Sequence, residues 1–183
     1  MIDPQQARQA LERAERLVDR DAVGRAYDAL AARIAADYAQ RDPLLLAVAV
    51  GGMVPTVELA QRLPFPLEMD YLHATRYRSG TRGGALTWKR QPAPERIAGR
   101  HVIVIDDVLD EGRTLAAVCR ALAGFAPAGI AVAVMVEKQV AREADAARAD
   151  YVGLRLPNRY LFGCGMDYGE HWRHLPEIWA LRE

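Results

Sequence analysis

Cysteine is scarce in this 183-residue chain, which has only Cys119 and Cys164. Neither residue has the spacing to other ligand residues that a metal site needs. Both lie among small or apolar residues, so we interpret them as reduced thiols in a cytoplasmic protein. This pattern excludes the class of small secreted domains that depend on several disulfides.

The sequence also lacks net charge, since 24 Lys and Arg balance 24 Asp and Glu. A neutral chain gives no bulk electrostatic reason to expect nucleic acid or an anionic membrane as a partner. The apolar run at residues 44–50 is too short to cross a bilayer, and the first residues carry no signal region. We expect one soluble cytoplasmic domain over residues 1–183, with a core large enough to fold unaided.

The first forty residues predict two packing helices, within residues 4–40, to which we assign no chemistry. Asp3 and Pro4 form a helix start, with Gln6 placed for a capping box. A second helix is expected after Asp21, because four apolar residues then recur at helical spacing. They are Tyr27, Leu30, Ile34 and Tyr38.

Buried strands alternate with helices over the rest of the chain. The sequence predicts strands at 44–50, 69–77, 101–105, 129–136, 151–154 and 160–163, and helices from Pro55 and over 114–126. This alternation predicts an α/β fold with a mostly parallel central sheet flanked by helices. Ligands bind such sheets at the carboxyl ends of the strands. Residues 78–96, with Trp88 in their middle, lack a regular pattern and are expected to form a mobile loop.

The most informative segment covers residues 101–115. A β-branched run leads into Asp106 and Asp107, and Asp110, Gly112 and Thr114 follow. The run indicates a strand covered on both faces, and the start of the next helix offers free N–H groups to a phosphate. Carboxylates beside a phosphate imply sugar hydroxyls, a metal ion or a proton to be moved.

The acids of this segment have two alternative interpretations. The acidic pair could be only a polar strand end, although acids that leave a buried strand need a partner. A phosphoacceptor receiver domain also clusters carboxylates, but its acids follow different strands, whereas these three lie within five residues.

The segment resembles the 5-phosphoribosyl 1-pyrophosphate (PRPP) signature of the type I phosphoribosyltransferases. The resemblance implies that Asp106 and Asp107 bind the ribose hydroxyls, directly or through a metal. It implies that residues 110–114 wrap the 5-phosphate, and that Asp110 faces N7 of a purine as the general base. The residues of this turn are Asp110, Glu111, Gly112, Arg113 and Thr114. The family fold adds a small hood built from terminal segments, and we assign residues 44–154 to the core and 155–183 to the hood.

Downstream motifs resemble the hypoxanthine-guanine branch of the family. Lys138 follows an apolar strand where that branch has its base-binding lysine, and its donors suit the O6 carbonyl of a 6-oxopurine. The motif at 156–163 implies that Tyr160 stacks on the purine and that Leu161 contributes backbone groups. Asp167 matches a second metal and base region, and Arg173 a pyrophosphate-binding position. Taken singly, a surface lysine, a core tyrosine and a solvated aspartate are ordinary alternatives.

The pyrophosphate side departs from the family. Val50 precedes Gly51 and Gly52 where many relatives have lysine, so the turn offers backbone N–H groups but lacks one cation. This departure leaves open whether the bond between Ala49 and Val50 is a non-proline cis bond. The resemblance places Tyr77 at the mobile-loop tyrosine, while Arg76 precedes it in place of the usual serine. We hypothesise that an arginine among Arg76, Arg78 and Arg82 supplies the missing charge.

The resemblance implies a purine-salvage enzyme that needs Mg²⁺, with Asp106, Asp107 and Asp167 as the metal-binding residues. It would transfer phosphoribose from PRPP to hypoxanthine or guanine, and the family implies a homodimer or homotetramer. Lys138 disfavours adenine, whose amino group presents a donor to a donor. A xanthine-preferring enzyme and a non-catalytic, PRPP-sensing regulator of the same fold remain as alternatives.

Overall fold

The computed structural model describes residues 2–76 and 86–182. The helices are α1 (Pro4–Arg13), α2 (Arg20–Tyr38), α3 (Met53–Ala60), α4 (Pro94–Ile97) and α5 (Arg113–Ala123). The strands are β1 (Glu15–Val18), β2 (Leu44–Val48), β3 (Glu68–Arg76), β4 (Leu86–Arg90), β5 (His101–Leu109), β6 (Gly129–Lys138), β7 (Tyr151–Leu156), β8 (Leu161–Phe162) and β9 (Ile178–Ala180). Among the described residues, no helix is long and apolar enough to span a membrane.

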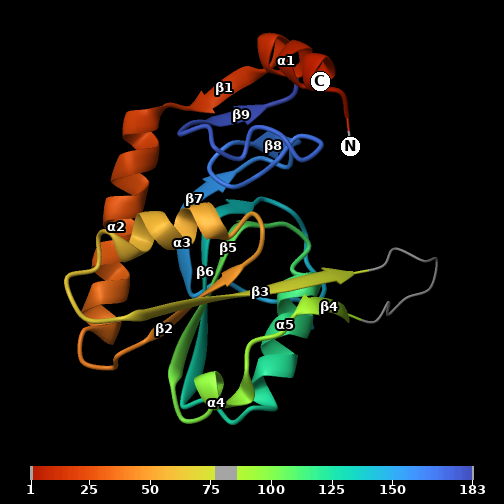
Figure 1. Ribbon diagram of the computed structural model, residues 1–183. Coiled ribbons are helices and arrows are strands. Elements are labelled where there is room, and N and C mark those ends of the chain that lie inside the picture. Colours follow the sequence, from red (N-terminus) through yellow and green to blue (C-terminus); the bar gives the residue numbers. More distant parts are fainter. Residues whose placement is uncertain (1, 77–85, 183) are drawn as a thin grey trace.

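Six strands form the central sheet in the order β4-β3-β2-β5-β6-β7. All neighbours in this sheet are parallel except β3 and β4. Helices α2 and α3 lie on one face, and α5 lies on the other (Figure 1). The prediction of an α/β fold with a mostly parallel sheet is therefore confirmed.

The alternation of side chains along β5 explains why both faces are covered. Ile103 and Ile105 pack into the core under α2 and α3, whereas Val102 and Val104 pack into the core under α5. All four side chains are fully buried. Because successive side chains of a strand point to opposite faces, an unbroken Val/Ile run requires a layer on each side.

The two ends of the chain build a second, three-stranded antiparallel sheet in the order β1-β9-β8. Helix α1 lies beside this sheet at one end of the molecule (Figure 1). It begins at an Asp3 cap with the predicted capping box to Gln6. The indole Nε1 of Trp172 donates to the Ala7 carbonyl at 2.7 Å, which ties α1 to the C-terminal segment. The hood is thus built from terminal segments, as expected.

Some boundaries differ from the sequence predictions. Residues 86–90 and 94–97 form β4 and α4 rather than irregular chain, because β4 pairs with β3 and Trp88 packs against the core under α5. Strand β1 lies in the stretch expected to hold only helices; it is short and exposed at its start, so no periodicity marks it. The rest of the predicted mobile loop, residues 77–85, lies outside the described residues.

Candidate active site

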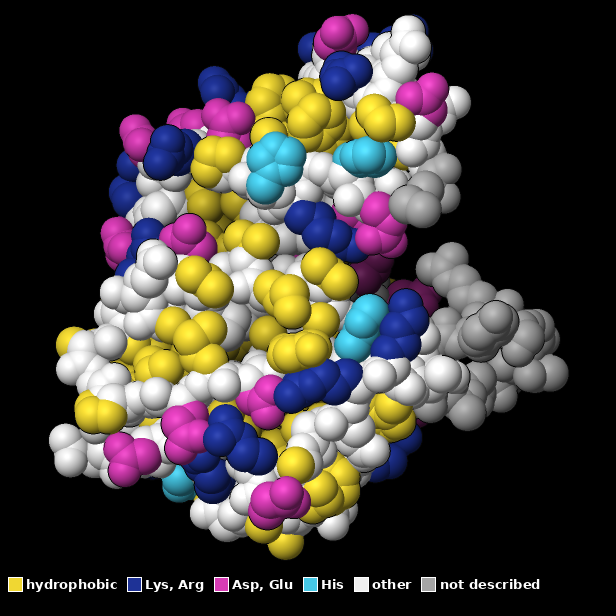
Figure 2. All heavy atoms as spheres, viewed as in Figure 1, with side chains coloured by type: hydrophobic (Ala, Val, Ile, Leu, Met, Phe, Trp, Pro, Cys, Tyr) yellow, Lys and Arg dark blue, Asp and Glu magenta, His cyan; other side chains and the backbone are white. Residues whose placement is uncertain are grey.

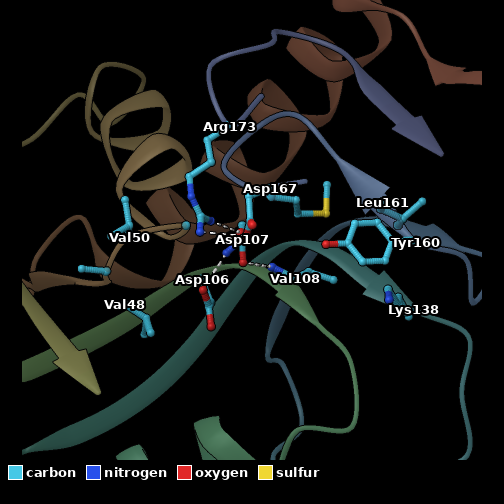
Figure 3. Close-up of a pocket in the computed structure, with 13 residues that line it drawn as sticks. Val48, Val50, Asp106, Asp107, Val108, Lys138, Tyr160, Leu161, Asp167 and Arg173 are labelled. Atoms are coloured by element: carbon cyan, nitrogen blue, oxygen red, sulfur yellow. Dashed lines mark hydrogen bonds and ion pairs between the residues drawn. The ribbon is translucent and has the colours of Figure 1, made fainter. Parts of the chain in front are cut away.

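A pocket of about 290 Å³ opens where the central sheet meets the second sheet, β1-β9-β8. Its lining comes from the carboxyl ends of β2, β5 and β6 and from the segment that follows β7. In Figure 3, Asp167 and Arg173 lie over Asp107, while Lys138 and Tyr160 lie together at the right. The lining residues are Val48, Ala49, Val50, Gly51, Asp106, Asp107, Val108, Lys138, Tyr160, Leu161, Met166, Asp167 and Arg173.

Asp106 and Asp107 lie side by side near the end of β5, with little exposure to solvent. Asp107 is only 8% exposed. The Asp107 N–H donates to Oδ1 of Asp106 at 3.0 Å, and the Val108 N–H donates to Oδ1 of Asp107 at 2.7 Å. Burial raises the pKa of both carboxyls, and the charge of Asp107 raises the pKa of Asp106 further. Two desolvated, adjacent carboxylates favour a ligand that supplies hydroxyl donors or positive charge.

Two glycines allow the chain to close around Asp107. A Cβ at Gly51 would overlap the Asp107 carboxylate, and a Cβ at Gly165 would overlap the Gly51 carbonyl. Gly165 also has φ +104°, a conformation that L side chains rarely adopt. The Ala49–Val50 bond of the same turn is cis. The glycine turn, the acidic strand end and the 163–166 turn therefore converge at one point.

The turn after β5 leads into the N-terminus of α5. Gly112 has φ +75° and is the N-cap, where a Cβ would meet the Ala147 carbonyl at 2.9 Å. The first turn of a helix has N–H groups without intrahelical partners, and here no side chain caps them. They are available to an anion. The Arg113 side chain pairs with Glu143 at 2.7 Å and lies 3.6 Å from Glu111.

Arg173 links the acids on the opposite wall. Its Nη2 lies 2.7 Å from Oδ1 of Asp167, and its Nη1 lies 3.9 Å from Oδ2 of Asp107. Nη1 also donates to the Gly165 carbonyl at 2.8 Å, and Nη2 lies 3.4 Å from Glu170. The arginine therefore offsets the charge of the carboxylates that face the pocket.

The other end of the pocket joins an ion pair to an aromatic ring. The Nζ of Lys138 lies 3.1 Å from Oδ2 of Asp110, and the two side chains are 14% and 50% exposed. The ring of Tyr160 is exposed and meets Tyr168 edge to face, with ring centroids 5.6 Å apart. A flat face beside a cation and a carboxylate suits a planar heterocycle with polar edges.

The backbone of Leu161 faces away from its neighbour strand. Leu161 pairs with Ala180 across β8 and β9, and the Leu181 N–H donates to the Tyr160 carbonyl. In an antiparallel pair, hydrogen-bonded and non-hydrogen-bonded positions alternate. Leu161 therefore occupies a non-hydrogen-bonded position, and its N–H and C=O are not used by β9. Since Leu161 lines the pocket, these groups can bind a ligand edge there.

Nine of the predicted residues line the pocket: Val50, Gly51, Asp106, Asp107, Lys138, Tyr160, Leu161, Asp167 and Arg173. None of the five predicted residues of the turn at 110–114 lines the pocket, although Asp110 pairs with Lys138, which does. Gly52 packs behind the pocket against the Ile105 carbonyl. Tyr77, Arg78 and Arg82 are outside the described residues, as is the side chain of Arg76.

The predicted site residues did not include four residues that line the pocket, Val48, Ala49, Val108 and Met166, or Arg142, whose guanidinium donates to the Asp110 carbonyl at 2.7 Å. Val108 belongs to the same strand end as the predicted acids, and Met166 precedes Asp167. Either could have been found by extending those motifs by one residue. Nothing in a single sequence separates Arg142 from the other arginines of the chain.

A parallel strand that ends in two carboxylates, a glycine turn and an uncapped helix N-terminus are together typical of α/β proteins that bind a phosphorylated ligand. The comparisons with known proteins specify the class. The phosphoribosyl transferase domain model matches residues 13–168. The chain belongs to the phosphoribosyl transferase family, a family of transferase enzymes.

Curated relatives share most of the chain. The chain is 30% identical over 167 residues to a hypoxanthine-guanine phosphoribosyltransferase of Streptococcus pneumoniae, covering 91% of this chain and 92% of the relative. It is 33% identical over 168 residues to a hypoxanthine-guanine-xanthine phosphoribosyltransferase of Tritrichomonas foetus, covering 91% of each. A solved Staphylococcus aureus hypoxanthine phosphoribosyltransferase has the same fold, with a TM-score of 0.84 at 24% identity over 92% of this chain and 91% of that one.

Proposed function

We propose that this protein transfers phosphoribose from PRPP to hypoxanthine or guanine, giving IMP or GMP and pyrophosphate in purine salvage. One observation carries the proposal: the Tyr160 ring and Lys138, which pairs with Asp110, lie at one end of a pocket whose other end holds Asp106, Asp107 and the glycine turn. The first group suits a 6-oxopurine and the second suits a phosphorylated ribose. The names of the curated relatives support the same substrates.

Each end of the pocket has a role in this reaction. The hydroxyls of ribose can donate to Asp106 and Asp107, and the N-terminus of α5 can bind the 5-phosphate. Val50 and Gly51 line the pocket at the position proposed for pyrophosphate, whereas the Gly52 N–H already donates to the Val48 carbonyl at 2.8 Å. This placement puts the anomeric carbon between the acids and the base.

The base is held by its edges and its face. Lys138 can donate to O6, and the free backbone groups of Leu161 can bind the far edge of the purine. Tyr160 covers one face of the ring. Bond formation between a purine nitrogen and the anomeric carbon breaks the bond to pyrophosphate, and the Asp110 carboxylate accepts the proton that the purine loses at N7. A carboxylate near the positively charged, oxocarbenium-like ribose also stabilises that charge.

The residues present fit Mg²⁺. In the described part of the chain, no three His, Cys, Asp or Glu side chains are arranged to hold a metal by themselves. Mg²⁺ commonly uses one or two carboxylates together with substrate phosphates and water. Asp106, Asp107 and Asp167 would provide such oxygen ligands, and the bound ion would neutralise charge on the departing pyrophosphate. Arg173 already lies between Asp107 and Asp167, where it can share that task.

Xanthine is a second candidate base. It shares the O6 carbonyl with hypoxanthine and guanine, so Lys138 and Asp110 do not discriminate against it. The Tritrichomonas foetus relative carries xanthine in its name. The 2-position of the base faces the Leu161 side in this arrangement, and preference among the three bases depends on that wall.

We propose that the protein forms a homodimer or homotetramer in the cytoplasm. Figure 2 shows hydrophobic side chains gathered on the face over α3 and β3. Val50, Met53, Val57, Met69 and Tyr71 are exposed large hydrophobic residues of this region. A contiguous apolar patch of this kind is typical of a protein interface. The two cysteines are free, which fits a reducing compartment.

An assay of purified protein with PRPP and Mg²⁺ tests the proposed reaction. Hypoxanthine, guanine, xanthine and adenine are supplied in turn, and nucleotide formation is followed. We expect turnover with hypoxanthine or guanine and none with adenine. No turnover with any base would contradict the enzymatic proposal and would favour a PRPP-binding regulator.

A further inference from the structure

Arg142 lies outside the pocket, in the loop after β6, four residues beyond Lys138. Its side chain is 18% exposed, and its guanidinium bonds to the ends of two neighbouring strands. Nε donates to the Asp110 carbonyl at 2.7 Å, and Nη2 donates to the carbonyls of Leu109 and Lys138 at 3.0 and 2.6 Å. Nη1 pairs with Glu137 at 3.2 Å. Every nitrogen of this side chain therefore has a partner.

These contacts fix the backbone beneath the Lys138–Asp110 pair. Strands β5 and β6 are in register up to Leu109 and Glu137. Beyond that point the chain of Asp110 turns toward α5, so the sheet no longer determines its position. The planar guanidinium of Arg142 donates to the carbonyls of residues 109, 110 and 138, so it holds the ends of β5 and β6 together. Such charge-assisted hydrogen bonds are stronger than neutral ones. A lysine ammonium lacks the planar set of donors that makes all three bonds possible.

The same loop braces the phosphate-binding turn from outside. The Ala147 N–H donates to the Gly112 carbonyl at 3.2 Å, and Glu143 pairs with Arg113 at 2.7 Å. Residues 142–147 therefore contact the turn at 110, 112 and 113 without reaching the pocket. Arg142 is the member of this set that also reaches the strand of Lys138.

We propose that Arg142 is a positioning residue, which holds Asp110 and Lys138 at the separation needed to engage one purine base together. The inference rests on the proposed function. It gives the loop after β6 a role in positioning the groups that bind the purine base. Misplacement of a reacting group by about 1 Å can cost roughly a hundredfold in rate. A residue that bonds to the backbone carbonyls of both Asp110 and Lys138 can therefore control turnover without touching substrate.

The chain offers a matched control. Arg155 also pairs with Glu137, at 2.9 Å, but is 67% exposed and, within the described residues, forms no hydrogen bond or ion pair with the turn at 110–114. Replacing Arg155 with Gln removes a charge beside Glu137 and leaves the three carbonyl contacts of Arg142 in place.

Three measurements compare wild type with Arg142→Gln, Arg142→Lys, Arg142→Ala and Arg155→Gln. First, kcat/KM for the base is expected to fall roughly tenfold to a hundredfold in all three Arg142 variants and to change less than twofold in Arg155→Gln. Second, millimolar guanidinium is expected to restore part of the activity of Arg142→Ala, whereas ammonium does not. Third, the backbone amides of Ala116 and Ala147, which both donate to the Gly112 carbonyl, are expected to exchange hydrogen at least about tenfold faster in Arg142→Gln.

Hydrogen exchange needs no turnover, so it separates the two proposals. Equal exchange at Ala116 and Ala147 in wild type, Arg142→Gln and Arg155→Gln overturns the inference, whatever the activity. Full activity of Arg142→Lys also overturns it, because charge alone would then suffice. A wild-type chain that fails to turn over any base overturns the proposed function, while faster exchange in Arg142→Gln still supports the positioning role.

Discussion

The ammonium group of Lys138 and the carboxylate of Asp110 are partners at 3.1 Å across the ends of β6 and β5. O6 and N7 of a 6-oxopurine are neighbouring atoms on one edge of the base. A cation and a carboxylate held this close can therefore engage both atoms at once, the cation at O6 and the carboxylate at N7. Adenine would instead present an amino group to the ammonium.

Replacing Lys138 with Met is expected to remove the bond to O6 while keeping the bulk of the side chain. A hydrogen bond to a charged group contributes about 1.5–3 kcal/mol, so kcat/KM for the base should fall by roughly tenfold to a hundredfold. Steady-state kinetics with hypoxanthine measures this change. Lys89, the other lysine of the chain, is exposed on β4 and provides the control Lys89→Met. Equal losses in the two variants would contradict the role of Lys138.

Asp110→Asn keeps the shape of the side chain but cannot accept the proton from N7. We expect turnover to fall by roughly a hundredfold or more, in line with general-base contributions. Binding of the nucleotide product should be largely kept, and calorimetric titration with IMP measures it. Asp28→Asn, at an exposed position of α2, serves as the matched control. Turnover of Asp110→Asn within threefold of wild type would rule out the general base.

Gly51→Ala should damage the PRPP end of the pocket, because the added methyl group overlaps the Asp107 carboxylate. Overpacking of this kind costs about 1–3 kcal/mol, so we expect the PRPP KM to rise roughly tenfold to a hundredfold. Gly24→Ala is the matched control, since its methyl group meets nothing within 4 Å and lies inside α2. That variant should keep the PRPP KM and gain stability, as alanine favours helix. An unchanged PRPP KM in Gly51→Ala would be inconsistent with this packing.

Asp106→Asn is expected to stabilise the free protein while weakening PRPP binding. Burial and the charge of Asp107 raise the pKa of Asp106. Ionisation of Asp106 therefore opposes folding, and this penalty grows as the pH rises from the unfolded pKa through the raised folded one. The gain from Asn, on the order of 1 kcal/mol, should be larger at pH 8 than at pH 5. Thermal unfolding of both proteins in EDTA measures it; a larger gain at pH 5 would reverse the expected sign.

Both thiols should react slowly in the native protein. Burial raises the pKa of Cys119 to about 11 and that of Cys164 to about 12. Because the thiolate is the reactive form, the labelling rate at pH 7.5 should be at least roughly a hundredfold below that of an ordinary thiol and should rise about tenfold per pH unit. Timed labelling with an aromatic disulfide from pH 7 to 9 checks this. Labelling of the folded protein at the rate of a free cysteine would contradict the buried positions.

The parts of the fold that could be predicted are those in which local pattern and packing agree. The Val/Ile run of β5 and the cap at Asp3 are both found as expected. Strand β1 was missed because four residues at the surface carry no period, and its pairing with β9 joins opposite ends of the chain. Strand β4 was missed because its partner β3, rather than its own composition, makes it a strand.

The site residues also divide into those that local sequence predicts and those that depend on contacts between distant segments. Asp106, Asp107 and Gly112 could be predicted because the strand end, the turn and the helix start lie within one short segment. The approach of Gly165 to Gly51, and the reach of Arg142 to the Asp110 carbonyl, depend on how distant segments fold together. No periodicity within the segments themselves carries that information.

The central claim is that one pocket joins PRPP to a 6-oxopurine. The most direct measurement follows nucleotide formation by the purified protein from PRPP and Mg²⁺ with hypoxanthine, guanine, xanthine and adenine in parallel. We predict IMP or GMP formation that requires Mg²⁺ and is lost with adenine. Turnover of adenine in preference to the oxopurines, or none with any base, would contradict the account.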